Sequence, residues 1–382
     1  MARVIEAPEV EAPARPAPDE VSAELHPSLT SDLLGHEDAE QTLAAALSGG
    51  NLHHAWLLAG PPGIGKATLA WRFARALLDS ERGGGLFGDP PDDLHVDPGS
   101  GLFTQVAGGA HPNLMVLRRQ WDFKARPPKY YTVIRVDDVR KLTGFLGQSA
   151  SREGRRVVLI DAADDLQFPS ASNALLKPLE EPPANTIFIL VCHQPGRLLP
   201  TIRSRCRRLD LRPPDRADAA TILTRAEPEL DNEAAGMLLH LADGSPGRAL
   251  RLHNAGGLEI YQDLLGLLGD LPRLSREKAQ KLAGQMDNRA TGEGAFNMLF
   301  DQAEGFLRRL LGFAATGEAA FVSDHEAALA TRLAPAGLEQ WFDVCDNLQR
   351  LRERTESVNL NRKAVTLTLF SAFEEAARRA AA

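Results

Sequence analysis

The chain has 382 residues and a formal net charge of −8 at pH 7, with 43% hydrophobic and 25% charged residues. This composition is typical of an ordered globular protein, and the length is sufficient for two or three domains with cores of their own. No apolar run approaches the roughly 20 residues that span a membrane, and the negative balance argues against strong nucleic-acid binding by this chain alone, although local basic clusters remain able to contact DNA within an assembly.

The N-terminal residues 1–27 are predicted to form a disordered tail, because Ala, Pro and Glu dominate and prolines interrupt any helix. The tail lacks the apolar core of a secretory signal and the basic character of a transit peptide. A short amphipathic helix is expected next, ending at Gly49-Gly50. The Gly-, Pro- and Asp-rich stretch from Glu81 to Ala110 predicts a long surface loop.

Between residues 28 and 213, apolar strand patterns alternate with helical patterns. The run Val157–Ile160 is continuously apolar, as expected of a strand that is buried on both faces of a parallel sheet. This alternation predicts an α/β domain whose parallel sheet is covered by helices. The strands are expected at residues 55–59, 114–117, 157–161 and 187–191, and the helices at residues 66–78, 136–146 and 170–181.

Beyond Pro214 no strand pattern is found. Residues 214–254 contain two helical patterns, and longer ones follow to the end of the chain. The sequence therefore predicts an α/β domain at 28–213, a small helical domain at 214–254 and a larger helical domain at 255–382.

A glycine-rich loop follows the first predicted strand and precedes a predicted helix, which is the context that a P-loop requires. Its glycines allow backbone N–H groups to turn toward an anion, and the helix N-terminus adds partial positive charge. Lys66 is placed to reach the β- and γ-phosphates of a nucleotide. The predicted nucleotide-binding residues are Gly60, Pro61, Pro62, Gly63, Ile64, Gly65, Lys66, Ala67, Thr68 and Asp161.

Two positions of this nucleotide site are wrong for catalysis. Ala67 stands where a hydroxyl would hold Mg²⁺, and Thr68 is turned about 100° around the helix. Asp161 is followed by Ala162, which cannot replace the glutamate that polarises the attacking water. We therefore expect no intrinsic ATPase activity, whereas binding of ATP or ADP and a purely structural loop both remain open.

A second cluster, Thr201–Arg208, carries four arginines at the expected edge of the α/β domain. Arginine is always charged and offers a rigid fork of donors, so one placed there could reach a phosphate held by a neighbouring subunit. Such an arginine finger contributes about 10³ to 10⁵ in rate. Composition alone favours the simpler interpretation, a solvated basic edge strand.

Three segments together resemble bacterial clamp-loader AAA+ subunits: Asn173–Pro183, Leu198–Ile202 and Ser204-Arg205-Cys206. The resemblance is strong over residues 30–212 and architectural beyond them. Motor subunits of that family usually keep the hydroxyl and the acidic pair that this chain lacks. The resemblance therefore implies an ATPase-inactive stator in which Arg205 is an arginine finger acting in trans, with Ser204 and Cys206 as its motif neighbours.

The same resemblance implies a helical lid at 214–254 and a collar at 255–382 that closes a pentamer. It implies gamma/tau and delta subunits as partners, contact with the sliding clamp and primed DNA through the assembly, and a cytoplasmic, replisome-associated location without a membrane. Residues 80–130 contain no cysteine, so the family's zinc module is not expected. Gly247 occupies the position of the lid's sensing arginine, with Arg248 displaced by one, and Pro178 predicts a helix kink.

Two alternatives remain open. One is a working AAA+ motor, similar to the gamma/tau subunits, with unusual ligands around its nucleotide. The other is an AAA+ protein similar to helicase loaders, which requires direct nucleic-acid binding despite the acidic balance.

Overall fold

The computed structural model describes residues 26–49, 52–79, 93–125, 129–147, 154–288, 291–358 and 360–380. Residues 1–25 of the predicted tail and residues 81–92 of the predicted surface loop lie outside this part. The chain divides into two compact units, residues 1–212 and 213–382.

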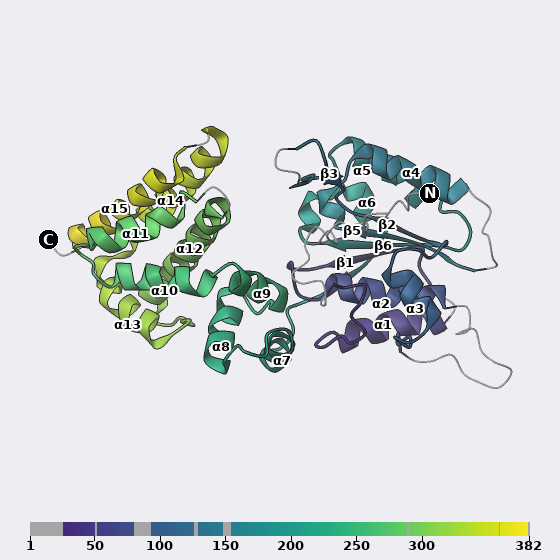
Figure 1. Cartoon of the computed structure of the whole chain (residues 1–382), viewed down its shortest axis with the longest axis horizontal. Helices are drawn as coiled ribbons and strands as arrows, with labels where there is room; N and C mark the ends of the chain where they lie inside the picture. Colours follow the sequence, from purple (N-terminus) through teal and green to yellow (C-terminus); the bar gives the residue numbers. More distant parts are fainter. Residues whose placement is uncertain are drawn as a thin grey trace, which may run out of the picture. The chain divides into compact units, whose positions relative to one another are not determined.

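The first unit is built on a five-stranded parallel sheet with strand order β2-β5-β6-β1-β7 (Figure 1). Alternate residues of β1 enter opposite cores, Trp56 and Leu58 on one face and Ala55 and Leu57 on the other. The predicted α/β class, with a parallel sheet buried on both faces, is confirmed. The strands are β1 (Ala55–Ala59), β2 (Leu114–Leu117), β5 (Arg156–Asp161), β6 (Thr186–Cys192) and β7 (Arg207–Asp210).

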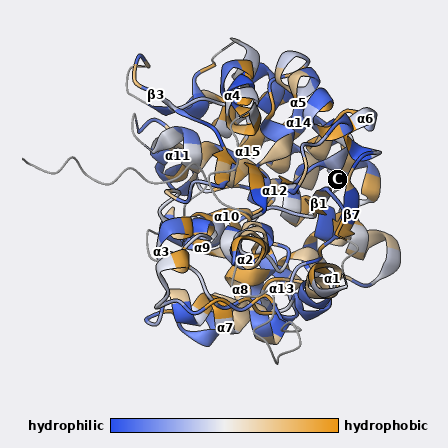
Figure 2. Cartoon of the chain, turned by 90° about the vertical axis from the view of Figure 1, so that its right-hand side faces the viewer, coloured by the Kyte–Doolittle hydropathy of each residue, from blue (hydrophilic) through white to orange (hydrophobic). Residues whose placement is uncertain are grey.

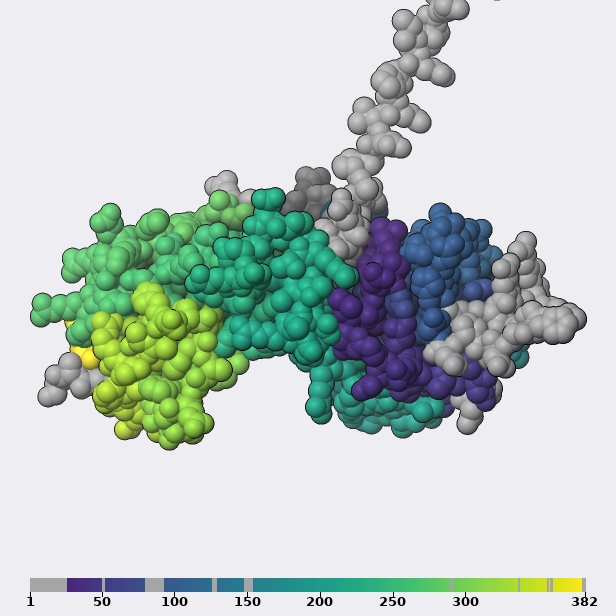
Figure 3. All heavy atoms as spheres, turned by 90° about the horizontal axis from the view of Figure 1, so that it is seen from below, coloured from purple at the N-terminus to yellow at the C-terminus, as the bar shows by residue number. Residues whose placement is uncertain are grey.

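Helices form a layer on each face of this sheet. One layer holds α1 (Glu37–Ser48), α2 (Lys66–Leu78) and α3 (Gly101–Ala107), whose purple and blue surface is seen from below in Figure 3. The other layer holds α4 (Val136–Gly147), α5 (Ser170–Glu180) and α6 (Pro200–Arg203). The helix α2 has the predicted bounds, and α1, α4 and α5 lie where helical patterns were found.

The prediction of a continuous surface loop over Glu81–Ala110 is wrong for its second half. Residues 101–107 form α3, and the side chains of Phe103 and Val106 are buried. The helix begins at Ser100, whose Oγ accepts a hydrogen bond from the Phe103 N–H at 3.1 Å. Its seven residues are too few to show a helical period among so many Gly, Pro and Asp residues.

A buried arginine ties this layer together. Arg75 of α2 donates from Nη1 to the Ser28 carbonyl and from Nη2 to the Thr30 carbonyl, both at 2.8 Å. Its guanidinium lies 4.5 Å from the centre of the Phe103 ring. Burial, and secondarily the charge of Arg72, lowers the pKa of Arg75 to about 10. One side chain thus fixes the segment before α1, the helix α2 and the helix α3.

Pro178 lies in the last turn of α5, two residues before the helix ends at Glu180. At this position the ring removes one hydrogen bond close to the end of the helix, where the interruption costs least. The kink remains a prediction.

The second unit contains no strand among its described residues, as predicted from Pro214 onward. Its later helices share one large hydrophobic core, and Figure 2 shows helices that carry hydrophobic and hydrophilic residues together. No helix in the described part of the chain is long and apolar enough to cross a membrane. The helices are α7 (Arg216–Ala226), α8 (Asn232–Leu241), α9 (Pro246–Asn254), α10 (Gly257–Leu268), α11 (Arg276–Gln285), α12 (Gly292–Thr316), α13 (Asp324–Leu333), α14 (Leu338–Val358) and α15 (Arg362–Ala380). A boundary at residue 254 remains a prediction.

A buried ion pair holds α13 against α12 in this unit. Glu326 is fully buried, and its Oε1 accepts from Arg309 Nε at 2.8 Å and lies 2.7 Å from Arg309 Nη2. Its Oε2 accepts from the Val322 N–H at 2.7 Å. The carboxylate and the nearby Tyr261 hydroxyl also interact, and burial is the main cause that raises the pKa of Tyr261.

We predict that Glu326→Ala lowers the free energy of unfolding by about 3 to 5 kcal/mol, because the largely enclosed Arg309, whose side chain is 17% exposed, is left without its partner. Urea unfolding followed by circular dichroism measures this loss. The control is Glu318→Ala, an exposed position where a change within about 0.5 kcal/mol is expected. A loss equal to that of the control would contradict a structural role for the pair.

Candidate functional site: the glycine-rich loop and Arg205

The glycine-rich loop joins the carboxyl end of β1 to the amino end of α2. All three of its glycines have backbone angles that favour glycine, φ +154° at Gly60, φ +77° at Gly63 and φ +104° at Gly65. A Cβ atom on Gly60 would lie only 2.4 Å from the carbonyl oxygen of Leu211, the residue after β7. The loop can therefore fold against the end of the edge strand only because Gly60 has no side chain.

The ammonium of Lys66 contacts the loop itself. Its Nζ donates to the Gly60 carbonyl at 2.7 Å and to the Pro61 carbonyl, and the side chain is 2% exposed. A phosphate entering the loop must replace these carbonyl contacts. The lysine is thus placed in the cradle, with its charge partly satisfied by backbone oxygens.

A histidine that the sequence analysis missed covers the other side of the loop. His36, just before α1, is buried, and its Nε2–H donates to the Ile64 carbonyl. A Cβ on Gly65 would lie 3.3 Å from His36 Nε2, so the two are in close contact. A single histidine ahead of a helix carries no sequence signal for this role.

The remaining predicted nucleotide-binding residues lie around the same edge of the sheet. Ala67 and Thr68 are half-buried in the first turn of α2, and Ile64 belongs to the core. Asp161 ends β5, which is separated from β1 by β6 alone. Because the strands are parallel, the loop and Asp161 share the carboxyl edge of the sheet.

The two carboxylates that follow Ala162 hold neighbouring loops. Asp164 accepts from the His193 N–H at 2.9 Å and from the Gln194 N–H at 3.1 Å, which joins the ends of β5 and β6. Asp165 pairs with Arg119 at 3.1 Å. Both side chains, two and three residues beyond the base position at Ala162, therefore have structural partners.

Arg205 lies at the amino ends of the parallel strands, whereas the glycine-rich loop lies at their carboxyl ends. It precedes β7, which pairs in parallel with β1 so that Trp56 faces Arg207 and Ala59 faces Asp210. The loop leaves β1 after Ala59, whereas Arg205 enters β7 before Arg207. Three residue steps along a strand place these ends about 10 Å apart. The structure thus separates Arg205 from the nucleotide loop of its own chain.

The guanidinium of Arg205 is held by two acceptors. Its Nη2 lies 2.6 Å from Glu180 Oε1, at the end of α5, and its Nη1 donates to the Thr201 carbonyl at 2.8 Å. One third of the side chain is exposed. Ser204 Oγ also donates to the Thr201 carbonyl, at 3.2 Å. The arginine is therefore oriented at the surface.

Its neighbours have different surroundings. Cys206 packs against the core under α4, α5 and α6. Arg207 lies over the Trp56 ring, 4.9 Å from its centre, and Arg208 pairs with Asp210. The interpretation of a basic edge strand is correct for Arg207 and Arg208, which are exposed in β7, but Arg205 lies before the strand.

The sequence also raised two questions away from the loop: the position of Arg248 in the predicted lid, and the presence of a metal site. Arg248, in α9, pairs with Asp243 at 3.0 Å within the second unit. Among the described residues, no group of three or more His, Cys, Asp or Glu side chains is arranged to hold a metal ion.

In comparisons with known proteins, the chain is similar to subunits of DNA polymerase III. The family model described as DNA polymerase III, delta subunit, matches residues 35–215. A protein of Pseudomonas aeruginosa named DNA polymerase III subunit delta' is 41% identical over 219 residues, which cover 57% of this chain and 61% of the relative. Proteins of the same name from Escherichia coli K12 and Yersinia pestis are 36% and 33% identical, covering 59% and 61% of this chain and 61% and 67% of those proteins.

The match spans about three fifths of the length of the P. aeruginosa and E. coli relatives. A DNA polymerase III gamma subunit-related protein from Thermotoga maritima is similar in structure over 89% of this chain and 99% of its own, with 17% identity and a TM-score of 0.39.

We predict that the thiols of Cys192 and Cys206 resist alkylation in the folded protein. Burial raises the pKa of each to about 12, so the reactive thiolate at about pH 8.5 falls several hundred-fold below that of a free cysteine. Mass spectrometry after iodoacetamide treatment of native protein, with the same chain in urea as control, measures the ratio. Equal rates in the two samples would show that Cys206 is a reactive surface thiol.

Proposed function

Because the chain belongs to the family of DNA polymerase III delta-prime subunits, we propose that it is the non-hydrolysing subunit of a clamp loader. In this role it helps to place the sliding clamp on primed DNA during replication. The observation that carries the proposal is the position of Arg205, exposed at the sheet edge opposite the chain's own nucleotide loop.

An arginine in this position acts on a phosphate of another subunit. The glycine-rich loop of the same chain lies at the carboxyl ends of the strands. An interaction within one chain would therefore require the Arg205 guanidinium to extend along the whole length of β7. The guanidinium has five N–H donors, and the contacts to Glu180 and Thr201 orient it while leaving further donors for a phosphate. Stabilisation of the transferring phosphoryl group in trans is the chemistry of an arginine finger.

The chain's own loop is proposed to bind ATP or ADP without hydrolysing it. Lys66 and the backbone N–H groups supply the phosphate cradle, whereas Ala67 and Ala162 supply neither a metal ligand nor a base. The contacts of Asp164 and Asp165 support this proposal, because the two carboxylates that follow Ala162 are held by other partners.

The proposed partners follow from the same role. Gamma/tau motor subunits receive Arg205, a delta subunit completes the loader, and the clamp and primed DNA are reached through the assembly. The helices of residues 255–382 join the collar, and the complex works at the replisome on the nucleoid.

We predict that Arg205→Ala lowers ATP turnover at the motor site facing this subunit by about 10³ to 10⁵. The measurement is steady-state ATP hydrolysis by the reconstituted loader in the presence of clamp and primed DNA. Arg205→Lys is expected to be nearly as impaired, because an ammonium lacks the planar fork of donors.

Arg208→Ala is the matched control, since Arg208 is close by and pairs only with Asp210 in the described structure. Its loader is expected to keep wild-type turnover. If both variants hydrolyse ATP as fast as wild type, Arg205 is not the arginine finger. If both are equally impaired, the effect comes from the positive charge of this edge in general and not from Arg205.

We predict that the isolated chain turns over no ATP above background, and that Lys66→Ala does not change this result. The physical reason is the absence of a hydroxyl at Ala67 and of a carboxylate at Ala162. A coupled-enzyme assay on purified protein tests it. Turnover that is abolished by Lys66→Ala would instead establish a motor with unusual ligands.

A further inference from the structure

A small β-hairpin stands at the carboxyl end of the edge strand β2. It is formed by β3 (Trp121–Asp122) and β4 (Lys129–Tyr130), which pair antiparallel so that Trp121 faces Tyr130. The two rings pack edge to face, with centres 4.8 Å apart. This hairpin was not predictable from the sequence, since two-residue strands have no apolar period.

The base of the hairpin is fixed to the α/β domain. The Tyr131 N–H donates to the Gln120 carbonyl at 2.9 Å, and Arg119 pairs with Asp165. Ile134 then bridges to the segment after β5, where its N–H donates to the Asp165 carbonyl at 2.7 Å. Two-residue strands are not stable alone, so these contacts are what hold the hairpin in place.

The hairpin region is strongly basic in an acidic chain. Residues 118–135 contain six basic side chains against one acidic, a net charge of +5, whereas the whole chain carries −8. Lys124 and Lys129 are exposed, and neither they nor Arg118 form an ion pair with the residues that the structure describes. The single acid, Asp122, accepts from the Lys124 backbone N–H. Three of the six cations, Arg118, Lys124 and Lys129, thus have no ion-pair partner in the part of the chain that the structure describes.

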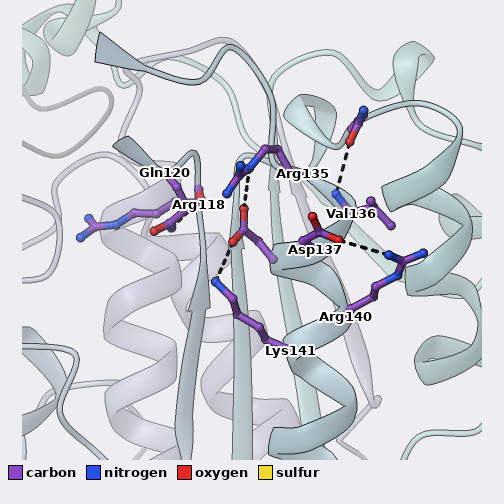
Figure 4. Close-up of polar contacts among 9 residues, drawn as sticks. Arg118, Gln120, Arg135, Val136, Asp137, Arg140 and Lys141 are labelled. Atoms are coloured by element: carbon purple, nitrogen blue, oxygen red, sulfur yellow. Dashed lines mark hydrogen bonds and ion pairs between the residues drawn. The ribbon is translucent and has the colours of Figure 1, made fainter. Parts of the chain in front are cut away.

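The cations at the start of α4 differ in this respect. The buried Asp138 lies 3.5 Å from Arg135 Nε and 2.7 Å from Lys141 Nζ, and Asp137 accepts from Arg140 (Figure 4). The Arg118 carbonyl accepts from Gln120 Nε2 at 3.0 Å, whereas Figure 4 marks no ion pair of the Arg118 guanidinium with the other residues drawn. The available charge therefore lies on the hairpin side, before the helix.

Two large aromatic rings are exposed at this end of the sheet. Phe123 follows β3 and is 64% exposed, and Phe168 follows the loop after β5 and is 70% exposed. The strands β2 and β5 that carry these loops are neighbours in the sheet. A single exposed apolar side chain is ordinary. Here Phe123 directly precedes the exposed Lys124, and Phe168 follows the segment that bridges to Ile134, so one end of the sheet offers both rings on which unpaired bases stack and cations that bind phosphates.

We propose that this hairpin surface, defined by Arg118, Phe123, Lys124, Lys129 and Phe168, binds single-stranded DNA directly. The rings take base faces, and the lysines and arginine take phosphates. An acidic peptide would use the same cations but has no use for exposed rings, so the aromatic component favours nucleic acid. The proposal goes beyond the function above, because it gives this chain its own DNA contact, independent of Arg205.

The test uses the full chain and a fluorescein-labelled oligothymidylate of about 15 nucleotides, followed by anisotropy at low salt. Phe123→Ala is expected to weaken binding by about 5- to 150-fold, the range for loss of one stacked base, while Phe123→Tyr keeps the ring and the affinity. Replacing Lys124 and Lys129 by Gln is expected to reduce the slope of log K against log salt by about 1.4, for two lost phosphate contacts.

The matched control combines Phe342→Ala in α14 and Lys281→Gln in α11, an exposed ring and an exposed cation elsewhere. It is expected to bind as wild type, as is Arg205→Ala, so failure here and failure of the arginine finger are distinguishable. The proposal is overturned if the wild-type chain does not bind the oligothymidylate, or if Phe123→Ala binds it with unchanged affinity. It is equally overturned if a duplex of the same length binds as tightly, or if a polyglutamate peptide at the same charge concentration displaces the oligothymidylate. Equal melting temperatures of all variants establish that the fold is intact.

Discussion

The parallel pairing of β7 with β1 is the constraint on which the functional arrangement depends. It brings the Leu211 carbonyl against Gly60, so the glycine-rich loop can close only over a residue without a side chain. The same pairing places Arg205 at the amino end of the sheet while the loop leaves at the carboxyl end. One set of backbone hydrogen bonds therefore builds the nucleotide cradle and directs the arginine away from it. A change that shifted the register of β7 would disturb both features together.

Around this pairing, charged side chains hold loops in position. Arg75 binds two carbonyls of the segment before α1, and that segment supplies His36 to the glycine-rich loop. Asp164 and Asp165 act similarly at the ends of β5 and β6, where they fix the base of the hairpin as well. Carboxylates at this edge would be candidates for catalysis in a hydrolytic relative. Here their hydrogen bonds give them structural tasks, which is consistent with a loop that keeps its phosphate cradle but lacks the groups for hydrolysis.

The three inner strands, β1, β5 and β6, were predictable because strands buried on both faces read as continuous apolar runs, as in Val157–Ile160. The edge strand β7 was not, since Arg207, Arg208 and Asp210 leave it without an apolar pattern. The nucleotide loop was found from glycine spacing, whereas His36 was missed because its contact to Ile64 joins residues 28 positions apart. The sequence placed Arg205 at the edge of the α/β domain. Its separation from the glycine-rich loop depends on the direction and register of β7 relative to β1, which only the structure shows.

Net charge misleads when it is averaged over the chain. A value of −8 predicts weak affinity for nucleic acid, and that inference holds only if the charges are spread evenly. They are not: the acids at the start of α4 pair with neighbouring cations, whereas Arg118, Lys124 and Lys129 of the hairpin region have no ion-pair partner in the described structure. Because screening limits the reach of a charge to about 10 Å, a phosphate at the hairpin responds to the local excess and hardly to distant acids. The acidic balance and a local DNA contact are therefore compatible in one chain, and the distribution of charge, not its sum, decides where a strand can bind.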